Sequence, residues 1–135
     1  MIDLVVDTDV VSYGFRRDQM YLPYAQHLAQ SNPVVAFATY AELMSGAKQR
    51  GWGQNRTDAL RRHVLNHYFV FDAPLDLCDI WADLVAQARS KGRVLNISDG
   101  WVAATAVYLN VPLASNNRRD YEYLDGLQLI SYAPT

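Results

Sequence analysis

Short apolar segments alternate along the chain with longer segments of helical periodicity. The short ones are rich in β-branched and aromatic residues, and they span 2–6, 34–37, 69–71, 112–114 and 127–130. The longer ones repeat apolar residues with the 3.6-residue period of an amphipathic helix. This alternation is typical of βαβ units, in which helices cover both faces of a mostly parallel sheet. The pattern therefore predicts an α/β fold.

Capping and helix-breaking residues suggest where the helices begin and end. Thr39 and Glu42 have the spacing of a capping box for a helix that continues to about Arg50. Ser98 is the expected N-cap of a second helix, which runs to about Leu109. Further helical segments are expected over 9–30, from 55 or 57 to about 68, and from 76 to 92.

Length and composition favour one globular domain over residues 1–135. Half of the 135 residues are hydrophobic and 19% are charged, and neither a linker nor an internal repeat interrupts the pattern. The net charge of −2 provides no strong basic field for non-specific binding of nucleic acid. Binding of RNA or DNA would therefore depend on local arginines or on a bound metal ion.

A single cysteine, Cys78, excludes an internal disulfide and a cysteine zinc site, and we expect it in the core. A reducing, cytoplasmic location fits this composition. The sequence has no signal-peptide pattern and no apolar run long enough to span a membrane.

Four acidic residues stand just past a strand-like segment or at the start of a predicted helix. They are Asp7, Glu42, Asp99 and Asp120. Because a parallel α/β sheet forms its ligand sites outside the carboxyl ends of the strands, we expect these acids to converge at one edge. Carboxylates in contact raise each other's pKa, and a divalent cation with oxygen ligands, Mg²⁺ or Mn²⁺, relieves that repulsion. The pattern thus points to metal-dependent phosphoester chemistry.

Each acid also has a structural explanation when it is considered alone. Asp9 or Thr8 can cap the helix that follows the first strand, which leaves Asp7 free. Glu42 can complete its capping box, although its apolar neighbours suggest a partly buried carboxylate that needs a partner. Asp99 can stabilise the positive end of its helix. Asp120 can belong to an ordinary polar loop.

The sequence resembles the PIN-domain ribonucleases, and among them the VapC-like toxins of bacterial toxin–antitoxin pairs. Four pieces in order carry the resemblance: 5–10 (Val-Val-Asp-Thr-Asp-Val), 41–43 (Ala-Glu-Leu), 98–106 (Ser-Asp-Gly-Trp-Val-Ala-Ala-Thr-Ala) and 113–121 (Leu-Ala-Ser-Asn-Asn-Arg-Arg-Asp-Tyr). The resemblance implies a three-layer α/β/α fold around a parallel sheet. It also implies a Mg²⁺- or Mn²⁺-dependent endoribonuclease, usually a homodimer, that a cognate antitoxin holds inactive.

Carried over to this sequence, the family pattern places its acidic catalytic and metal-binding positions at Asp7, Glu42, Asp99 and Asp120. We expect Asp7 and Asp99 to be direct ligands, and Glu42 and Asp120 to bind directly or through water. Residues expected to orient these carboxylates or their waters are Thr8, Asp9, Ser115 and Asn117. Two small departures are Asp9, where many members have Asn, and Tyr121, where Phe is commoner.

Basic and aromatic residues supply candidates for contact with RNA or with a partner. Arg118 and Arg119 lie beside Asp120 and are the preferred RNA-binding residues. A second group on one predicted helix reads more simply as a solvated face: Arg56, Arg61, Arg62 and His63. Trp52 could stack on a base, meet the antitoxin or pack in its loop, whereas Trp81 and Trp101 read as core residues or a dimer surface. His27 and His67 are expected to be structural.

Three alternatives to a nuclease are a phosphatase, a non-catalytic binding module and a dinucleotide-binding protein. Asp7-Thr8-Asp9 imitates the Asp-x-Asp motif of haloacid-dehalogenase-like phosphatases, but the later motif of that family does not follow Lys91. A non-catalytic binding module on the same fold would have no need of all four acids. A dinucleotide-binding protein is disfavoured because no G-x-G-x-x-G motif follows the first strand.

Overall fold

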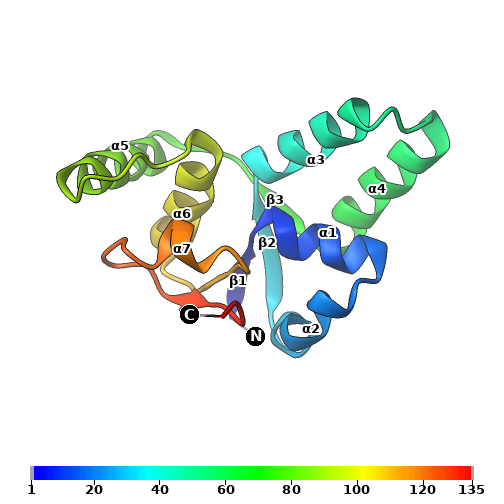
Figure 1. The fold of residues 1–135 in the computed structure, drawn as a ribbon, viewed down its shortest axis with the longest axis horizontal. Coiled ribbons are helices and arrows are strands. Elements are labelled where there is room, and N and C mark those ends of the chain that lie inside the picture. Colours follow the sequence, from blue (N-terminus) through cyan, green and yellow to red (C-terminus); the bar gives the residue numbers. More distant parts are fainter. Residues whose placement is uncertain (1, 135) are drawn as a thin grey trace.

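A five-stranded parallel sheet forms the centre of the molecule in the computed structural model, which describes residues 2–134 (Figure 1). Its strands are β1 Asp3–Val6, β2 Asn32–Ala36, β3 Phe69–Phe71, β4 Leu113–Ala114 and β5 Leu129–Ile130. They lie in the order β3-β2-β1-β4-β5, and every neighbouring pair is parallel. Each strand-like segment of the sequence therefore contains one strand, although Phe37 begins a helix instead.

Helices occupy the intervals between the strands. They are α1 Thr8–Arg16, the 3₁₀ helix η1 Gln19–Tyr21, α2 Leu22–Ala29, α3 Phe37–Gln49, α4 Gln54–His67, α5 Leu75–Ser90, α6 Ile97–Leu109 and α7 Arg118–Tyr121. The helical segment expected over 9–30 is thus three pieces. It breaks at Arg17, which adopts a left-handed conformation with φ of 55°.

Two predicted helix caps were wrong. Helix α3 begins at Phe37 after Ala36, so Thr39 lies inside the first turn and is fully buried, where it does not act as a cap. Helix α6 begins at Ile97, because the side chain of Asn96 accepts hydrogen bonds from the backbone N–H groups of Ser98 and Asp99. Asn96 therefore fills the capping position expected for Ser98.

Alternating side chains along the strands divide the core into two layers. Leu4 and Val6 of β1 pack with buried residues of helices α1 to α4. Val5, which points the other way, packs with buried residues of α5 and α6. Figure 1 shows α1 to α4 on one side of the sheet and α5 to α7 on the other. The predicted three-layer α/β/α architecture is confirmed.

The strand order places a topological switch between β1 and β4. Strands β2 and β3 extend the sheet from one side of β1, whereas β4 and β5 extend it from the other. Such a switch opens a crevice outside the carboxyl ends of the strands. Here the register pairs Val6 with Ala114, so the next residues, Asp7 and Ser115, lie beside each other at that crevice.

The α5–α6 pair forms the outer wall of one layer. Leu77, Leu84 and Ala88 of α5 are buried in it, as the apolar stripe predicts. Trp81 and Trp101 stack with ring centroids 4.9 Å apart and are each half-buried, at the margin of that core. Cys78, which we expected in the core, is half-buried and is not one of the residues of this cluster. No helix within residues 2–134 combines the length and apolar character needed to cross a membrane.

Candidate active site

Asp7 stands at the carboxyl end of β1 and is the acid most deeply enclosed by the protein, with only 3% of the residue exposed. Its Oδ1 accepts a hydrogen bond from the Thr8 backbone N–H at 2.8 Å, and its Oδ2 accepts one from the Ser115 hydroxyl at 2.7 Å. Asp7 is therefore the N-cap of α1, the position expected for Asp9 or Thr8. Asp7 is thus both the cap of this helix and a candidate metal ligand.

The loop after β4 is fastened to the start of α1 by Asp9. The two carboxylate oxygens of Asp9 accept hydrogen bonds from the backbone N–H groups of Val10 and Asn116, at 2.7 and 2.9 Å. The hydroxyl of Ser115 accepts a bond from the Asn117 N–H at 3.0 Å while it donates to Asp7. Asp9 thus ties the loop to α1, and Ser115 links that loop to Asp7.

Asp99 reaches the same crevice from the first turn of α6. It is half-buried, and its Oδ1 accepts a hydrogen bond from the Tyr121 hydroxyl at 3.2 Å. The same hydroxyl also lowers the pKa of the Asp7 carboxyl group. A tyrosine from α7 therefore links an acid on β1 to an acid on α6.

Glu42 approaches from α3, one turn after its start. Its Oε1 accepts a hydrogen bond from the Thr8 hydroxyl at 2.8 Å, and that hydroxyl lies 3.0 Å from the hydroxyl of Thr39. Glu42 itself is exposed, so the expectation of a partly buried carboxylate was wrong. The hydrogen-bond partner expected for this carboxylate is present, and it is Thr8, the residue after Asp7.

Asp120 lies on the one-turn helix α7 and is exposed, as is Asn117 just before that helix. The backbone N–H of Asp120 bonds to the Asn117 carbonyl at 3.0 Å, which closes the predicted helical turn. Asp120 is close enough to Asp99 to raise the pKa of that carboxyl group. The structure therefore brings all four sequence-predicted acids into one electrostatic neighbourhood.

The pKa values of the acids record this crowding. Burial, together with the charge of Glu42, raises the pKa of Asp7, although hydrogen bonds from Ser115, Thr8 and Tyr121 oppose the shift. Burial and the charge of Asp7 raise the pKa of Asp9 to about 7. Burial raises the pKa of Asp99 to about 6, with further increases from the charges of Asp7, Asp120 and Glu42. Asp9 and Asp99 are therefore partly protonated near neutral pH.

The donor set of this crevice suits a hard cation. The interactions that set the pKa of Asp7, Asp9 and Asp99 include no basic side chain from the described part of the chain. Within residues 2–134, however, no three His, Cys, Asp or Glu side chains are close enough to form a complete ligand set. Mg²⁺ commonly binds through one or two carboxylates and keeps several waters, so the arrangement fits an ion with few direct protein ligands.

An open groove of about 580 Å³ adjoins the crevice on the α3 side. Glu42 lines it together with Phe37, Ser98 and Trp101, and the rest of its lining comes from further α3 residues, most of them small. Glu42 is therefore accessible to a large substrate.

The two predicted RNA-binding arginines are placed differently. The guanidinium group of Arg118 donates hydrogen bonds to the carbonyls of Ser131 and Ala133, which ties α7 to the C-terminal segment. Arg119 is exposed, and its backbone carbonyl accepts a hydrogen bond from the Arg93 guanidinium group at 2.8 Å. Of the two, Arg119 has the side chain that is more available to a phosphate.

The second basic group lies on α4 and is occupied by local contacts. Arg61 pairs with Asp58 at 2.6 Å and bonds to the Tyr40 hydroxyl. Arg56 lies 3.9 Å over the ring of Trp52, in a cavity of about 150 Å³ whose lining includes none of the four acids. His63 packs against His67.

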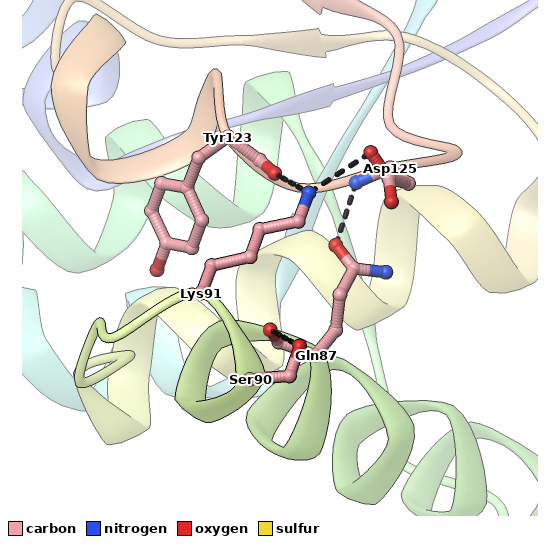
Figure 2. A network of polar contacts seen from close by, with 5 residues as sticks. All are labelled: Gln87, Ser90, Lys91, Tyr123 and Asp125. Carbon is pink, nitrogen blue, oxygen red and sulfur yellow. Dashed lines mark hydrogen bonds and ion pairs between the residues drawn. The ribbon is translucent and has the colours of Figure 1, made fainter.

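Sequence reasoning missed the residues that hold α7 in place. Lys91, at the end of α5, donates to the carbonyl of Tyr123 and pairs with Asp125 at 3.0 Å, while Gln87 accepts from the Asp125 N–H at 2.6 Å (Figure 2). Arg93 lies 4.2 Å over the ring of Tyr123. The only signal was a cluster of basic and polar residues before Gly92, which is typical of many helix ends.

Comparison with known proteins yields a consistent match. The family model described as "PIN domain" matches residues 4–126. The VapC ribonuclease Y4jK of Sinorhizobium fredii (strain NBRC 101917 / NGR234) is 31% identical, over 95% of this chain and 96% of the relative. The crystal structure of VapBC2 from Rickettsia felis, bound to a promoter DNA fragment, superposes with a TM-score of 0.83 at 17% identity, over 97% and 99% of the two chains. The crystal structure of VapBC-5, from the VapBC family of toxin–antitoxin systems in Mycobacterium tuberculosis, superposes with a TM-score of 0.72 at 20% identity, over 97% and 99%.

Proposed function

The chain belongs to the PIN-domain family, and from this premise we propose that it is a ribonuclease toxin of a toxin–antitoxin pair. In this proposal it hydrolyses phosphodiester bonds within RNA, tRNA or another structured RNA, and depends on Mg²⁺ or Mn²⁺. The observation that carries the proposal is the convergence of Asp7, Asp99, Glu42 and Asp120 at the switch point, where the charges of the other three raise the pKa of Asp99. The ribonuclease relative, which matches over nearly the whole chain, supplies the reaction.

The proposed roles follow from where each side chain lies. Asp7 and Asp99 are the direct ligands, because they enclose the crevice from β1 and α6 and share the Tyr121 hydroxyl. Glu42 and Asp120 are exposed at its rim, where they hold waters around the ion. When bound, the divalent cation neutralises the acids and lowers the pKa of a water for attack on phosphorus.

The remaining residues orient the acids. Ser115 and the Thr8 N–H fix both oxygens of Asp7, and the Thr8 hydroxyl fixes Glu42. Asp9 holds the loop after β4 against α1 by accepting from the Asn116 N–H, and the Asn117 N–H donates to the Ser115 hydroxyl within that loop. These contacts leave the carboxylates little freedom to rotate away from a shared ion.

RNA would approach across the exposed rim. Arg119 is the preferred phosphate contact because its side chain is exposed beside Asp120. Arg118 contributes through the fixed position that it gives α7. The groove beside Glu42, with Phe37 and Trp101 in its lining, can accept uncharged parts of the substrate.

The proposed partners are a cognate antitoxin and a second copy of the chain. The relatives of known structure are VapBC complexes, which supports an antitoxin as the physiological inhibitor. The homodimer rests on the resemblance to VapC-like toxins. Family membership removes the phosphatase alternative, and a non-catalytic module differs from the present proposal in having no use for a metal ion.

The substitution Asp7→Asn tests the proposal. Asparagine can still accept from the Thr8 N–H and meet the Ser115 hydroxyl, so the fold should persist while a charged ligand is lost. A ligand that contributes several kcal/mol to the transition state should reduce cleavage by about 100-fold or more. The measurement is cleavage of total cellular RNA with Mn²⁺, and the cleaved ends are sequenced to identify the substrate.

Asp79→Asn, an exposed acid on α5, is the matched control and should cleave like the wild type. Unchanged cleavage by folded Asp7→Asn would refute the proposal.

A further inference from the structure

Tyr121 occupies a position in the site that the reaction scheme above does not use. It is fully buried at the end of α7, yet its hydroxyl donates a hydrogen bond to Oδ1 of Asp99 at 3.2 Å. The hydroxyl is also close enough to Asp7 to lower the pKa of that carboxyl group. Its ring packs in the α5–α6 core, so the hydroxyl cannot swing away to water.

The hydroxyl meets a specific electrostatic need. Asp7 raises the pKa of Asp99, while the Tyr121 hydroxyl lowers the pKa of both acids. Burial and the two nearby acids raise the pKa of Tyr121 itself, so the phenol remains a protonated donor. A hydrogen bond from this buried hydroxyl holds the Asp99 carboxylate in one orientation and stabilises its negative charge.

The segment around Tyr121 is anchored on both sides. Before it, the Arg118 guanidinium group bonds to the carbonyls of Ser131 and Ala133, and Arg93 bonds to the Arg119 carbonyl. After it, Lys91 and Gln87 of α5 hold Tyr123 and Asp125, as Figure 2 shows. These contacts on both sides fix the position of the Tyr121 hydroxyl relative to β1 and α6.

We propose that Tyr121 is a positioning residue whose hydroxyl sets the spacing and orientation of Asp7 and Asp99 for a divalent cation. This inference rests on the proposed metal-dependent nuclease function and deepens it. A phenylalanine at this position would fill the same volume but would offer no donor. Orienting partners of metal ligands typically change metal affinity or activity by about 10- to 100-fold when they are removed.

The test is Tyr121→Phe, which deletes one oxygen and keeps the ring. Mn²⁺ binding is measured by calorimetry at pH 7.5 without RNA, and cleavage of total RNA is measured over a Mn²⁺ titration. We expect Mn²⁺ to bind about 10-fold more weakly or worse. The Mn²⁺ concentration for half-maximal cleavage should rise by the same factor, with KM for RNA unchanged.

Tyr68→Phe is the matched control, because Tyr68 is also a buried tyrosine but lies in the opposite core layer. It should leave Mn²⁺ affinity unchanged. A purely structural role for Tyr121 would lower the melting temperature without moving the metal titration, and that result would overturn the inference.

The outcomes for the wild type separate the two claims. If the wild type binds Mn²⁺ and cleaves RNA while Tyr121→Phe binds Mn²⁺ equally or more tightly, only the positioning role fails. If the wild type neither binds Mn²⁺ nor cleaves RNA, the proposed function fails and the positioning role falls with it.

Discussion

At the scale of single residues, Asp9 shows most directly how the crowded acids affect the stability of the fold. It lies between α1 and the loop after β4, and the charged groups facing it are Asp7 from β1 and Asp99 from α6. Burial and these charges raise its pKa from the ordinary 3.8 to about 7. The folded protein therefore holds this proton more tightly than the unfolded chain does.

Because the pKa of Asp9 is higher in the folded protein than in the unfolded chain, the stability of the fold depends on pH. The contribution of Asp9 is fully present below about pH 4, and it is lost as the pH rises through about 7. In EDTA, wild-type stability should therefore fall relative to Asp9→Asn between pH 5 and pH 8. The expected change is about 1–3 kcal/mol, because the three acids titrate together. Urea unfolding of both proteins at the two pH values measures it, and an equal difference at pH 5 and pH 8 would contradict the account.

Sequence reasoning predicted that the acids would converge but could not assign all of their contacts. The expected convergence of Asp7 and Asp99 follows from a parallel sheet, which the alternating pattern predicts. The exposure of Glu42 and the hydroxyl contact of Tyr121 depend on how α3 and α7 are rotated against the sheet. Apolar periodicity does not specify such rotations within one turn.

Helix α6 illustrates, at the scale of elements, how packing overrides local preference. Asn96 and Ser98 are both good capping residues, so the sequence could not choose between them, and the structure selects Asn96. Gly100, next to Asp99, is weak for a helix interior, yet it is buried against Trp81. A Cβ there would lie 2.7 Å from Nε1 of Trp81, whose ring is stacked on Trp101.

Gly100→Ala should therefore destabilise the protein, although alanine is the better helix former. Forcing the tryptophan stack apart should cost about 1–3 kcal/mol. Gly46→Ala in α3 is the matched control, because its Cβ would meet only the mobile guanidinium end of Arg50, at 2.9 Å. That variant should be stabilised by about 0.5–1 kcal/mol. Denaturant unfolding of the two variants should show changes of opposite sign in the free energy of unfolding. A stabilised Gly100→Ala would contradict the account, because it would show that the Trp81–Trp101 stack moves apart without cost.

The molecule as a whole is a parallel sheet whose switch point collects acids from elements far apart in sequence. β1, α3, α6 and α7 each contribute one acid to the crevice. Sequence pattern predicted the three layers and the sheet because alternation of short and long apolar segments persists along the chain. It could not predict how α7 is held, because the bonds from Arg118 to Ser131 and Ala133 depend on the irregular path of the C-terminal segment.

A cation bound at this crevice should stabilise the whole fold. Binding to the folded state alone adds about 2.7 kcal/mol when the free ion is 100-fold above its Kd. The melting temperature in Mn²⁺ should therefore exceed that in EDTA by several degrees for the wild type, and by much less for Asp99→Asn. Differential scanning fluorimetry measures both, and an equal shift in the two proteins would place the ion elsewhere.

The most direct measurement of the central claim is a metal-exchange cleavage assay on the wild-type protein. Total cellular RNA is incubated with the protein in EDTA, then with Mn²⁺ in excess of the chelator, and the RNA ends are sequenced at each stage. The account predicts no cleavage in EDTA and defined internal cuts after Mn²⁺ is added. Undiminished cleavage in EDTA, or intact RNA with Mn²⁺ present, would contradict it.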